Sequence, residues 1–281
     1  MAIVNVTDPT TNIIYNYYLD DKMKRAIDKK ILPAISKAVD DDYVMVIDGK
    51  ERSGKSTLAQ QIGRYIDPTL NVSRICFSPE EFREAVMNAD KGQCVIFDEA
   101  YRGYGSSSAL SEVNRILKAM MMEMGQKNLF VIIILPTFYL LEKYVAIWRA
   151  KCLIHVYRIK ATRGYWRGFN ARKKMKLYLN PIGKKFYSYT HVKTSFKGKF
   201  FGKIVIDDEE YKKKKSKSFM DGFKQTREEK SMFQRDILVY YLHSNYKMTQ
   251  ESITKVFKDG GSQLARTTIT EIIRKMKERS G

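Results

Sequence analysis

The sequence predicts an α/β fold in which a mainly parallel sheet is covered by helices on both faces. Between residues 41 and 160, short apolar, β-branched runs alternate with segments of helical spacing, and the runs are apolar throughout rather than at every second position. Strands buried on both faces with helices between them are typical of parallel sheets. A chain of 281 residues has room for one such domain and a small second module.

The expected elements follow in order along the chain. Residues 1–40 are an N-terminal helical arm, with a helix over 19–38 that Pro33 interrupts. Residues 41–160 form the core of the domain, with five strands. These strands are Tyr43–Asp48, Arg74–Phe77, Gln93–Asp98, Asn128–Leu135 and Cys152–Tyr157, and the helices between them cover Ser56–Tyr65, Pro79–Asn88, Leu110–Gly125 and Phe138–Trp148.

After residue 160 the pattern changes. Residues 161–230 combine basic, aromatic β-hairpins, expected over 163–179 and 184–190, with a lysine-rich linker at 212–217. Residues 231–281 are expected to form three helices. A helix capped by Thr249, a Gly260-Gly261 turn and a third helix with a polar front resemble a helix-turn-helix or winged helix-turn-helix module that binds DNA. A plain three-helix adaptor is the alternative.

The net charge of +20 is concentrated in the second half of the chain. Residues 1–150 carry 19 basic and 19 acidic side chains, residues 151–230 carry 23 and 7, and residues 231–281 carry 9 and 5. Aromatic rings interleave with the cations between residues 163 and 189, where they can stack on bases or fill a core. DNA is therefore the expected partner of residues 160–230 and of the C-terminal module; an acidic protein or a membrane face is the alternative.

The cysteines and the hydropathy of the sequence indicate the cellular compartment of the protein. The three cysteines, Cys76, Cys94 and Cys152, lie far apart in apolar runs, as buried free thiols of an intracellular, cytoplasmic protein do. The first ten residues have no signal-peptide pattern, and the longest apolar run, Leu129–Leu135, is too short to cross a bilayer. Membrane insertion is not expected.

A phosphate-binding motif follows the first strand. Residues 49–57 read GKERSGKST, which fits GxxxxGK[ST] between a strand and a helix. The glycines allow backbone N–H groups to turn toward phosphates, Lys55 can reach the β- and γ-phosphates, and the Ser56 hydroxyl can ligate Mg²⁺. The nucleotide contacts are expected from Gly49, Lys50, Glu51, Arg52, Ser53, Gly54, Lys55, Ser56 and Thr57, and the ligands are ATP and Mg²⁺.

A second motif ends the strand at residues 93–98. An apolar strand that ends in an acid places Asp98 at the carboxyl edge of the sheet, beside the phosphate loop, where it can hold Mg²⁺. Glu99 is positioned to polarise the attacking water. Two acids that only cap the next segment are the alternative. The sequence here resembles P-loop ATPases with an extra strand between the two motifs and a catalytic glutamate, and Arg74–Phe77 corresponds to that strand.

Other catalytic residues are less well marked. The strand Asn128–Leu135 is the expected central neighbour, and Thr137 is its candidate sensor of the γ-phosphate. Arg149 is the first candidate for an arginine finger toward a neighbouring subunit and Arg115 the second, while Arg102 can act within its own subunit. Surface arginines are the alternative for each.

The layout of residues 40–160 resembles the FtsK–HerA superfamily, and within it the zonular-occludens-toxin-like ATPases of viruses and plasmids. The features that carry the resemblance are the DEA at residues 98–100, a long helix, the GQKN turn, a very apolar strand and the final IHVY strand. The resemblance implies a homo-oligomeric, usually hexameric, ATP-driven motor that translocates or packages DNA or serves in replication. An ATP-switched DNA-binding regulator or partition protein is the second hypothesis, and a small-molecule kinase is the third.

Overall fold

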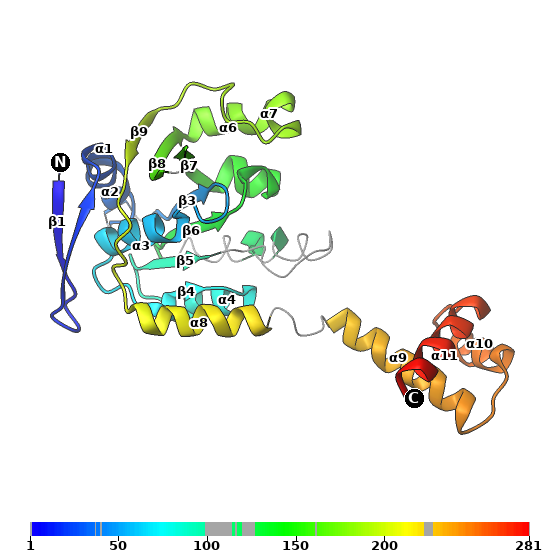
Figure 1. Ribbon diagram of the computed structural model, residues 1–281. Helices are drawn as coiled ribbons and strands as arrows, with labels where there is room; N and C mark the ends of the chain where they lie inside the picture. The colour runs from blue at the N-terminus through cyan, green and yellow to red at the C-terminus, as the bar shows by residue number, and fades with distance from the viewer. Residues whose placement is uncertain are drawn as a thin grey trace. The chain divides into compact units, whose positions relative to one another are not determined.

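The computed structural model describes residues 2–36, 38–39, 41–98, 114–115, 117–119, 127–160, 162–221 and 227–280. The chain divides into two compact units, Met1–Gly222 and Phe223–Gly281 (Figure 1). Among the described residues, no helix has both the length and the apolar character that crossing a bilayer requires.

The first unit begins with a hairpin and continues as an α/β domain. Its strands are β1 Ala2–Thr7, β2 Ile14–Leu19, β3 Tyr43–Asp48, β4 Ile75–Cys76, β5 Cys94–Phe97, β6 Phe130–Leu135, β7 Ala150–Ile159, β8 Thr162–Asn170 and β9 Phe196–Lys199. Its α-helices are α1 Asp21–Ala26, α2 Leu32–Ala34, α3 Lys55–Ile66, α4 Pro79–Asn88, α6 Ala171–Leu179, α7 Pro181–Lys185 and α8 Asp208–Asp221, with π-helical turns at Ile27–Ile31 and Val145–Arg149 and 3₁₀ turns at Val72–Arg74 and Phe138–Leu140.

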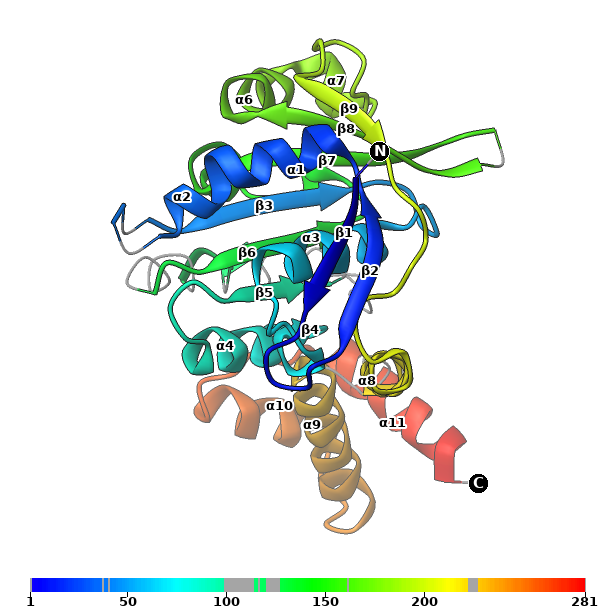
Figure 2. The ribbon, with the colours of Figure 1, turned by 90° about the vertical axis from the view of Figure 1, so that its left-hand side faces the viewer.

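The central sheet confirms the predicted α/β class. Its strand order is β4-β5-β6-β3-β7-β8-β9, in which the first five strands run parallel and β8 and β9 are antiparallel additions (Figure 2). Strand β6 lies between β3 and β5, so the strands that precede the two predicted phosphate-site motifs end at the same edge of the sheet with one strand between them. That edge is where ligands of open α/β sheets bind.

Successive residues of the parallel strands enter two different cores because side chains alternate across a sheet. On one face Met45 and Ile47 pack with α3 and the N-terminal hairpin. On the other face Val44 and Val46 pack with α4 and α6. Both cores exclude water from the strands, which explains why the strands are apolar at every position. The three cysteines are buried and free, as expected.

Several expected elements are wrong. The N-terminal arm begins with the β1–β2 hairpin, and its helix begins at Asp21 rather than at residue 19. The single helix expected over 138–148 is two short turns. The second half of the first expected hairpin is helix α6, because Asn170 accepts a hydrogen bond from the N–H of Lys173 and caps it. No strand lies within 184–190, whose first two residues end α7, and the expected lysine-rich linker lies within α8.

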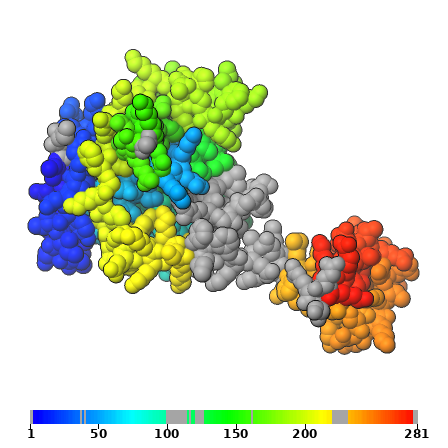
Figure 3. All heavy atoms as spheres, in the orientation of Figure 1, coloured from blue at the N-terminus to red at the C-terminus, as the bar shows by residue number. Residues whose placement is uncertain are grey.

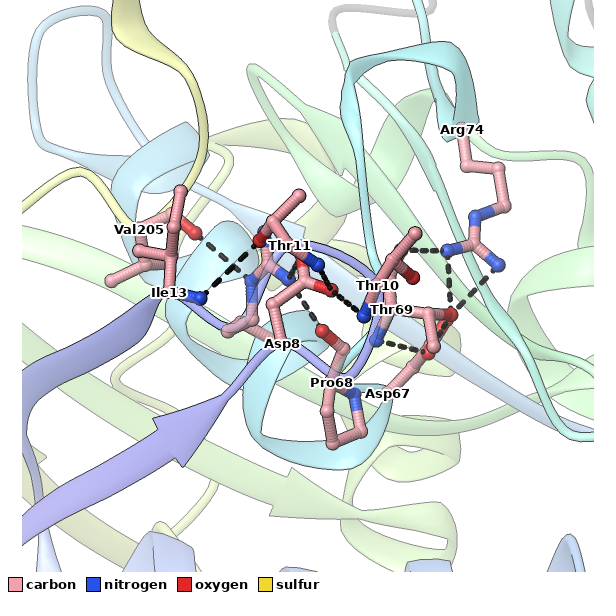
Figure 4. Close-up of polar contacts among 10 residues, drawn as sticks. Asp8, Thr10, Thr11, Ile13, Asp67, Pro68, Thr69, Arg74 and Val205 are labelled. Carbon is pink, nitrogen blue, oxygen red and sulfur yellow. Dashed lines mark hydrogen bonds and ion pairs between the residues drawn. The ribbon is translucent and has the colours of Figure 1, made fainter.

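A buried ion pair fixes the hairpin to the end of α3. Arg64 and Asp8 have side chains that are 2% and 8% exposed, and their Nη1 and Oδ2 atoms are 3.0 Å apart. The Arg64 guanidinium also donates to the carbonyl of Val205, 3.0 Å away. Figure 4 shows Asp8 and its hydrogen bond from Thr10, next to the Asp67–Arg74 ion pair. One arginine therefore joins the hairpin, α3 and the segment before α8.

Replacing Arg64 with alanine is expected to lower the free energy of unfolding by about 3–5 kcal/mol, because the change leaves the Asp8 carboxylate buried without its partner. Urea denaturation measures the change. The control is Lys24→Ala, which removes a pair with Asp28 whose side chains are 39% and 35% exposed, so a much smaller loss than that of Arg64→Ala is expected. Equal effects of the two changes would contradict the role of Arg64.

The same ion pair predicts a pH dependence. Burial alone would raise the pKa of Asp8, but hydrogen bonds from Thr10, Thr11 and Arg64 outweigh burial and hold this pKa below its ordinary value. The stabilisation is therefore complete above the pKa of an unfolded aspartate, about 4, and is lost as the pH falls through the lower pKa of the folded state. In Arg64→Ala the pKa of Asp8 in the folded state is expected to rise, so this stabilisation should be smaller and its loss should be complete at a higher pH.

The second unit is a small helical module. Its helices are α9 Arg227–Ser244, α10 Gln250–Asp259 and α11 Arg266–Ser280. The side chain of Thr249 accepts a hydrogen bond from the N–H of Ser252, so it caps α10 as the sequence indicates. Val239, Ile253 and Ile269 are fully buried in a common core. Three helices around one small core satisfy both the helix-turn-helix and the adaptor hypotheses.

Candidate nucleotide-binding site

The phosphate loop connects β3 to α3. Gly49 follows the strand with a φ of 144°, and a Cβ atom there would lie 2.1 Å from the carbonyl oxygen of Val156. Gly54 precedes the helix with a φ of 99°, and its Cβ would lie 2.8 Å from the ring of Phe200. Both backbone conformations are ones that residues with a side chain rarely adopt. The two glycines of the motif are therefore required by geometry and not only by the pattern.

Lys55 lies inside the loop. Its Nζ atom donates to the carbonyl oxygens of Gly49 and Lys50, at 2.8 and 3.0 Å, and the residue is 7% exposed. Burial lowers the pKa of Lys55, while the nearby carboxylates of Asp98 and Asp48 oppose that shift. In the part of the chain that the structure describes, carbonyl oxygens alone accept from this buried ammonium, which is therefore well placed to bind phosphate oxygens that carry full charges.

Asp98 follows β5 and is 1% exposed. Its Oδ2 atom accepts a hydrogen bond from the hydroxyl of Tyr211 at 2.9 Å and lies 3.7 Å from Nζ of Lys215. Its Oδ1 atom has no hydrogen-bond partner among the described residues. A buried carboxylate oxygen without a partner is costly, so this atom marks a place where a ligand can bind.

The residues that contact Asp98 belong to a segment that crosses the domain, residues 200–221, which we call the strap. The yellow part of Figure 3 shows it on the face of the domain that carries the N-terminal hairpin. Gln61 on α3 donates to the carbonyl oxygens of Phe201 and Lys203, at 2.7 and 3.0 Å. Lys214 on α8 donates to the carbonyl of Ile75 at 2.7 Å. These contacts attach the strap to both sides of the nucleotide site.

A cavity of about 300 Å³ lies between the phosphate loop and the strap. Gly54, Lys55, Ser56 and Thr57 form its floor, and Gln60 lies next to them on α3. The opposite side is lined by Arg163, Ile204, Tyr211 and Lys215. The predicted phosphate-binding residues therefore share one cavity with two cations from other elements of the same unit, Arg163 on β8 and Lys215 on α8.

The donor set fits Mg²⁺ in the form that it takes in nucleotide sites. Within the described ranges, no group of three or more histidine, cysteine, aspartate or glutamate side chains could hold a metal alone. Magnesium bound with a nucleotide needs few protein ligands, because phosphate oxygens and water supply the rest. The unpartnered Oδ1 of Asp98 and the cavity-lining Ser56 are oxygen donors of the required kind.

The other predicted site residues that the structure describes do not line this cavity. Glu99 and Arg102 lie outside the described residues, and Arg115 lies on a short described stretch away from the cavity lining. Arg149 forms an ion pair with Asp42 just before β7, at the edge of the sheet opposite the phosphate loop. Thr137 follows β6 at the correct edge, with its hydroxyl 2.9 Å from that of Tyr189. The roles of Thr137, Arg149 and Glu99 stay predictions.

Sequence reasoning did not identify Tyr211 and Lys215 as neighbours of Asp98. A partial signal exists, because Asp207 and Glu210 have the spacing of a helix start, and Oδ1 of Asp207 accepts from the N–H of Glu210 at 2.9 Å. The helix that follows places residues 211 and 215 on one face. Nothing in the sequence indicates that this face meets a strand end 113 residues away.

Comparisons with known proteins give a remote structural likeness. No family model matches the chain, and no curated protein matches it. Among solved structures, DnaA from Aquifex aeolicus with bound AMPPCP is similar over 93% of this chain and 90% of that one, with 14% sequence identity and a TM-score of 0.33. A likeness at this level does not bear on function, and the conclusion that the site supports is an α/β domain whose phosphate loop opens a helix at the carboxyl edge of a mainly parallel sheet.

Proposed function

We propose that this chain is an Mg²⁺-dependent ATPase that acts on DNA inside the cell. It is a subunit of a homo-oligomer, a hexamer, that translocates, packages or replicates the DNA of a virus or plasmid. One observation carries the proposal: Lys55 is buried in its loop close enough to Asp98 for their charges to interact, and Oδ1 of Asp98 has no hydrogen-bond partner among the residues that the structure describes. A buried cation and a buried oxygen donor at one strand edge are the two halves of a metal–nucleotide site.

Each residue then has a task. The loop N–H groups and Lys55 bind the β- and γ-phosphates, and Ser56 and Asp98 hold Mg²⁺, which neutralises the charge that develops on the transferred phosphoryl group. Glu99 orients the attacking water and accepts its proton. Arg163 and Lys215, which line the same cavity, supply further positive charge from within the subunit. Arg149 acts toward the nucleotide of a neighbouring subunit.

Steady-state ATP hydrolysis by the purified protein, with and without DNA and at two salt concentrations, tests this function. We expect DNA to raise turnover several-fold and added salt to remove the increase, because phosphate contacts release counterions. If continuous hydrolysis is unaffected by DNA, the protein is an ATPase whose partner is not DNA. Binding of ATP without hydrolysis under any condition would contradict the proposed enzyme.

One observation favours the second hypothesis, an ATP-switched DNA-binding regulator. Helix α8 contacts Asp98 through Tyr211 and Lys215, and the described chain resumes after α8 with the C-terminal unit. A metal bound at Oδ1 of Asp98 would draw on the same negative charge that holds Tyr211 and Lys215 at Oδ2, and would so weaken the hold of Asp98 on α8. A switch hydrolyses ATP slowly and changes its DNA affinity between ATP and ADP, whereas a motor turns over continuously on DNA.

Removing residues 223–281 is expected to weaken DNA binding about tenfold or more and to leave hydrolysis without DNA within about twofold. The reason is that the C-terminal unit has its own core and the nucleotide cavity is lined by the first unit. Fluorescence anisotropy with a labelled duplex and a hydrolysis assay measure the two properties. Unchanged DNA affinity would contradict the helix-turn-helix hypothesis and favour the adaptor.

A further inference from the structure

A row of aromatic rings and cations covers one face of the antiparallel end of the sheet. His155 pairs with Arg167 and Tyr157 pairs with Tyr165 across β7 and β8, and Tyr165 pairs with Lys199 on β9. Directly opposed residues of antiparallel strands project to the same face, as do residues two apart on one strand. The opposite face is the core, where Val156 and Trp166 are fully buried.

The rings on this face have nearly parallel planes and lie next to one another. The ring of His155 lies 3.8 Å from that of Tyr189, with an interplanar angle of 22°. Tyr157 is 6.2 Å from His155 and 5.9 Å from Tyr165, at 11° and 30°. We call these four residues the aromatic row. Tyr157 and Tyr165 are partly exposed, so the row presents ring surface to solvent.

Positive charges flank the row. The Arg167 guanidinium lies 4.6 Å from the centre of the Tyr157 ring, and Nζ of Lys199 lies 5.3 Å from that of Tyr165. Residues 150–170 and 196–199, which supply the three strands, contain no aspartate or glutamate. Planar rings in series with cations beside them match a nucleic acid strand, whose bases stack and whose phosphates need counter-charges.

The row leads to the nucleotide site. A cavity of about 720 Å³ opens between the phosphate loop and the strand ends, and it is lined by His155, Tyr157, Tyr187 and Tyr189 on one side and by Lys50, Glu51 and Ser53 on the other. His155 donates its Nδ1–H to Oδ1 of Asp48 at 2.9 Å. The other Asp48 oxygen accepts from the N–H of Phe138 at 2.7 Å and from the Tyr189 hydroxyl. Asp48 directly precedes the phosphate loop.

We propose that the aromatic row is a binding site for single-stranded nucleic acid, with bases stacked on Tyr157 and Tyr165 and phosphates bound by Arg167 and Lys199. A duplex hides its base faces, so only an unpaired strand can use the rings. The nucleic acid strand enters the cavity beside the phosphate loop. The His155–Asp48 hydrogen bond then couples the position of the bound strand to the conformation of residues 49–54. This inference rests on the proposed function and specifies the form of nucleic acid that the enzyme handles.

Binding of labelled 12-nucleotide strands to the full chain, measured by fluorescence anisotropy, tests the site. In the double variant Tyr157→Leu, Tyr165→Leu the apolar bulk stays and the rings are lost, so affinity for the strand is expected to fall about 100-fold, or about tenfold per ring. Affinity for a 20-base-pair duplex is expected to change less than threefold. The variant Tyr157→Phe, Tyr165→Phe keeps the rings and should bind as the natural protein does.

The matched control is Phe186→Leu, because Phe186 is 68% exposed beside Lys185 and lies outside the row. DNA and RNA strands of equal length are both used, and the one bound more tightly identifies the natural sugar. Equal losses for strand and duplex, or an unchanged strand affinity in the leucine variant, would overturn the site while leaving the ATPase intact. A natural protein that neither hydrolyses ATP nor binds any DNA would instead refute the proposed function itself.

Discussion

Replacing Lys55 with alanine is expected to lower ATP turnover at least about 100-fold, the loss seen when one preorganised charge is removed from the transition state of group transfer. The Nζ atom now donates to two loop carbonyls 2.8 and 3.0 Å away and can turn to the phosphates without leaving the loop. Arg52, Arg163 and Lys215 also line this cavity, but of these four cations only Lys55 is buried. Steady-state hydrolysis and binding of a fluorescent ATP analogue measure the loss.

A measurement of thermal stability distinguishes the loss of catalysis in Lys55→Ala from a loss of folded protein. Because burial lowers the pKa of Lys55, the folded protein disfavours its ammonium form relative to water. The alanine variant should therefore melt at a temperature equal to or above that of the natural protein. Lys29→Ala, at an exposed position on the N-terminal segment, is the control and should hydrolyse ATP normally. Normal turnover in Lys55→Ala would refute the assignment of the nucleotide site.

The parallel core could be predicted because its signals are local. Strand β3 has the bounds that its apolar run predicts, and α4 begins after Ser78, whose side chain accepts from the N–H of Glu81. Helix α6 was missed because its stability depends on a distant contact: Lys174 is fully buried and donates to the carbonyl of Ile147 at 3.1 Å. Nothing about a lysine within a basic run of sequence indicates that both its aliphatic stem and its ammonium group are buried.

The candidate site also has a part that local sequence predicts and a part that it does not. Loop residues 49–57 are contiguous, so the spacing of two glycines and a lysine is enough to place them. The strap and the aromatic row are assembled from residues far apart in sequence, and their basic and aromatic side chains also suit a solvated surface. Asp48 is the clearest example. The sequence shows that it precedes the phosphate loop, but it does not show the hydrogen bonds of Asp48 to His155 and Phe138, which are 107 and 90 residues away in sequence.

Replacing Asp98 with asparagine is expected to lower turnover about 100- to 1,000-fold while ATP still binds. Asparagine has nearly the same shape and its carbonyl oxygen can still accept the hydrogen bond from Tyr211, so the packing of α8 is kept. What it loses is the negative charge that we propose holds Mg²⁺ together with Ser56. A titration of Mg²⁺ at fixed ATP should show that far more metal is needed for the remaining activity.

The paired variant is Tyr211→Phe, which removes the hydroxyl 2.9 Å from Asp98 but keeps the ring against Phe77. In the proposed site the metal at Oδ1 and the hydroxyl at Oδ2 share the charge of one carboxylate, so the phenylalanine variant should need less Mg²⁺ for half-maximal turnover than the natural protein. Opposite shifts in the two variants would locate the metal at Asp98 and show that α8 senses it. An unchanged Mg²⁺ requirement in Asp98→Asn would place the metal elsewhere, and the strap would then be a structural element alone.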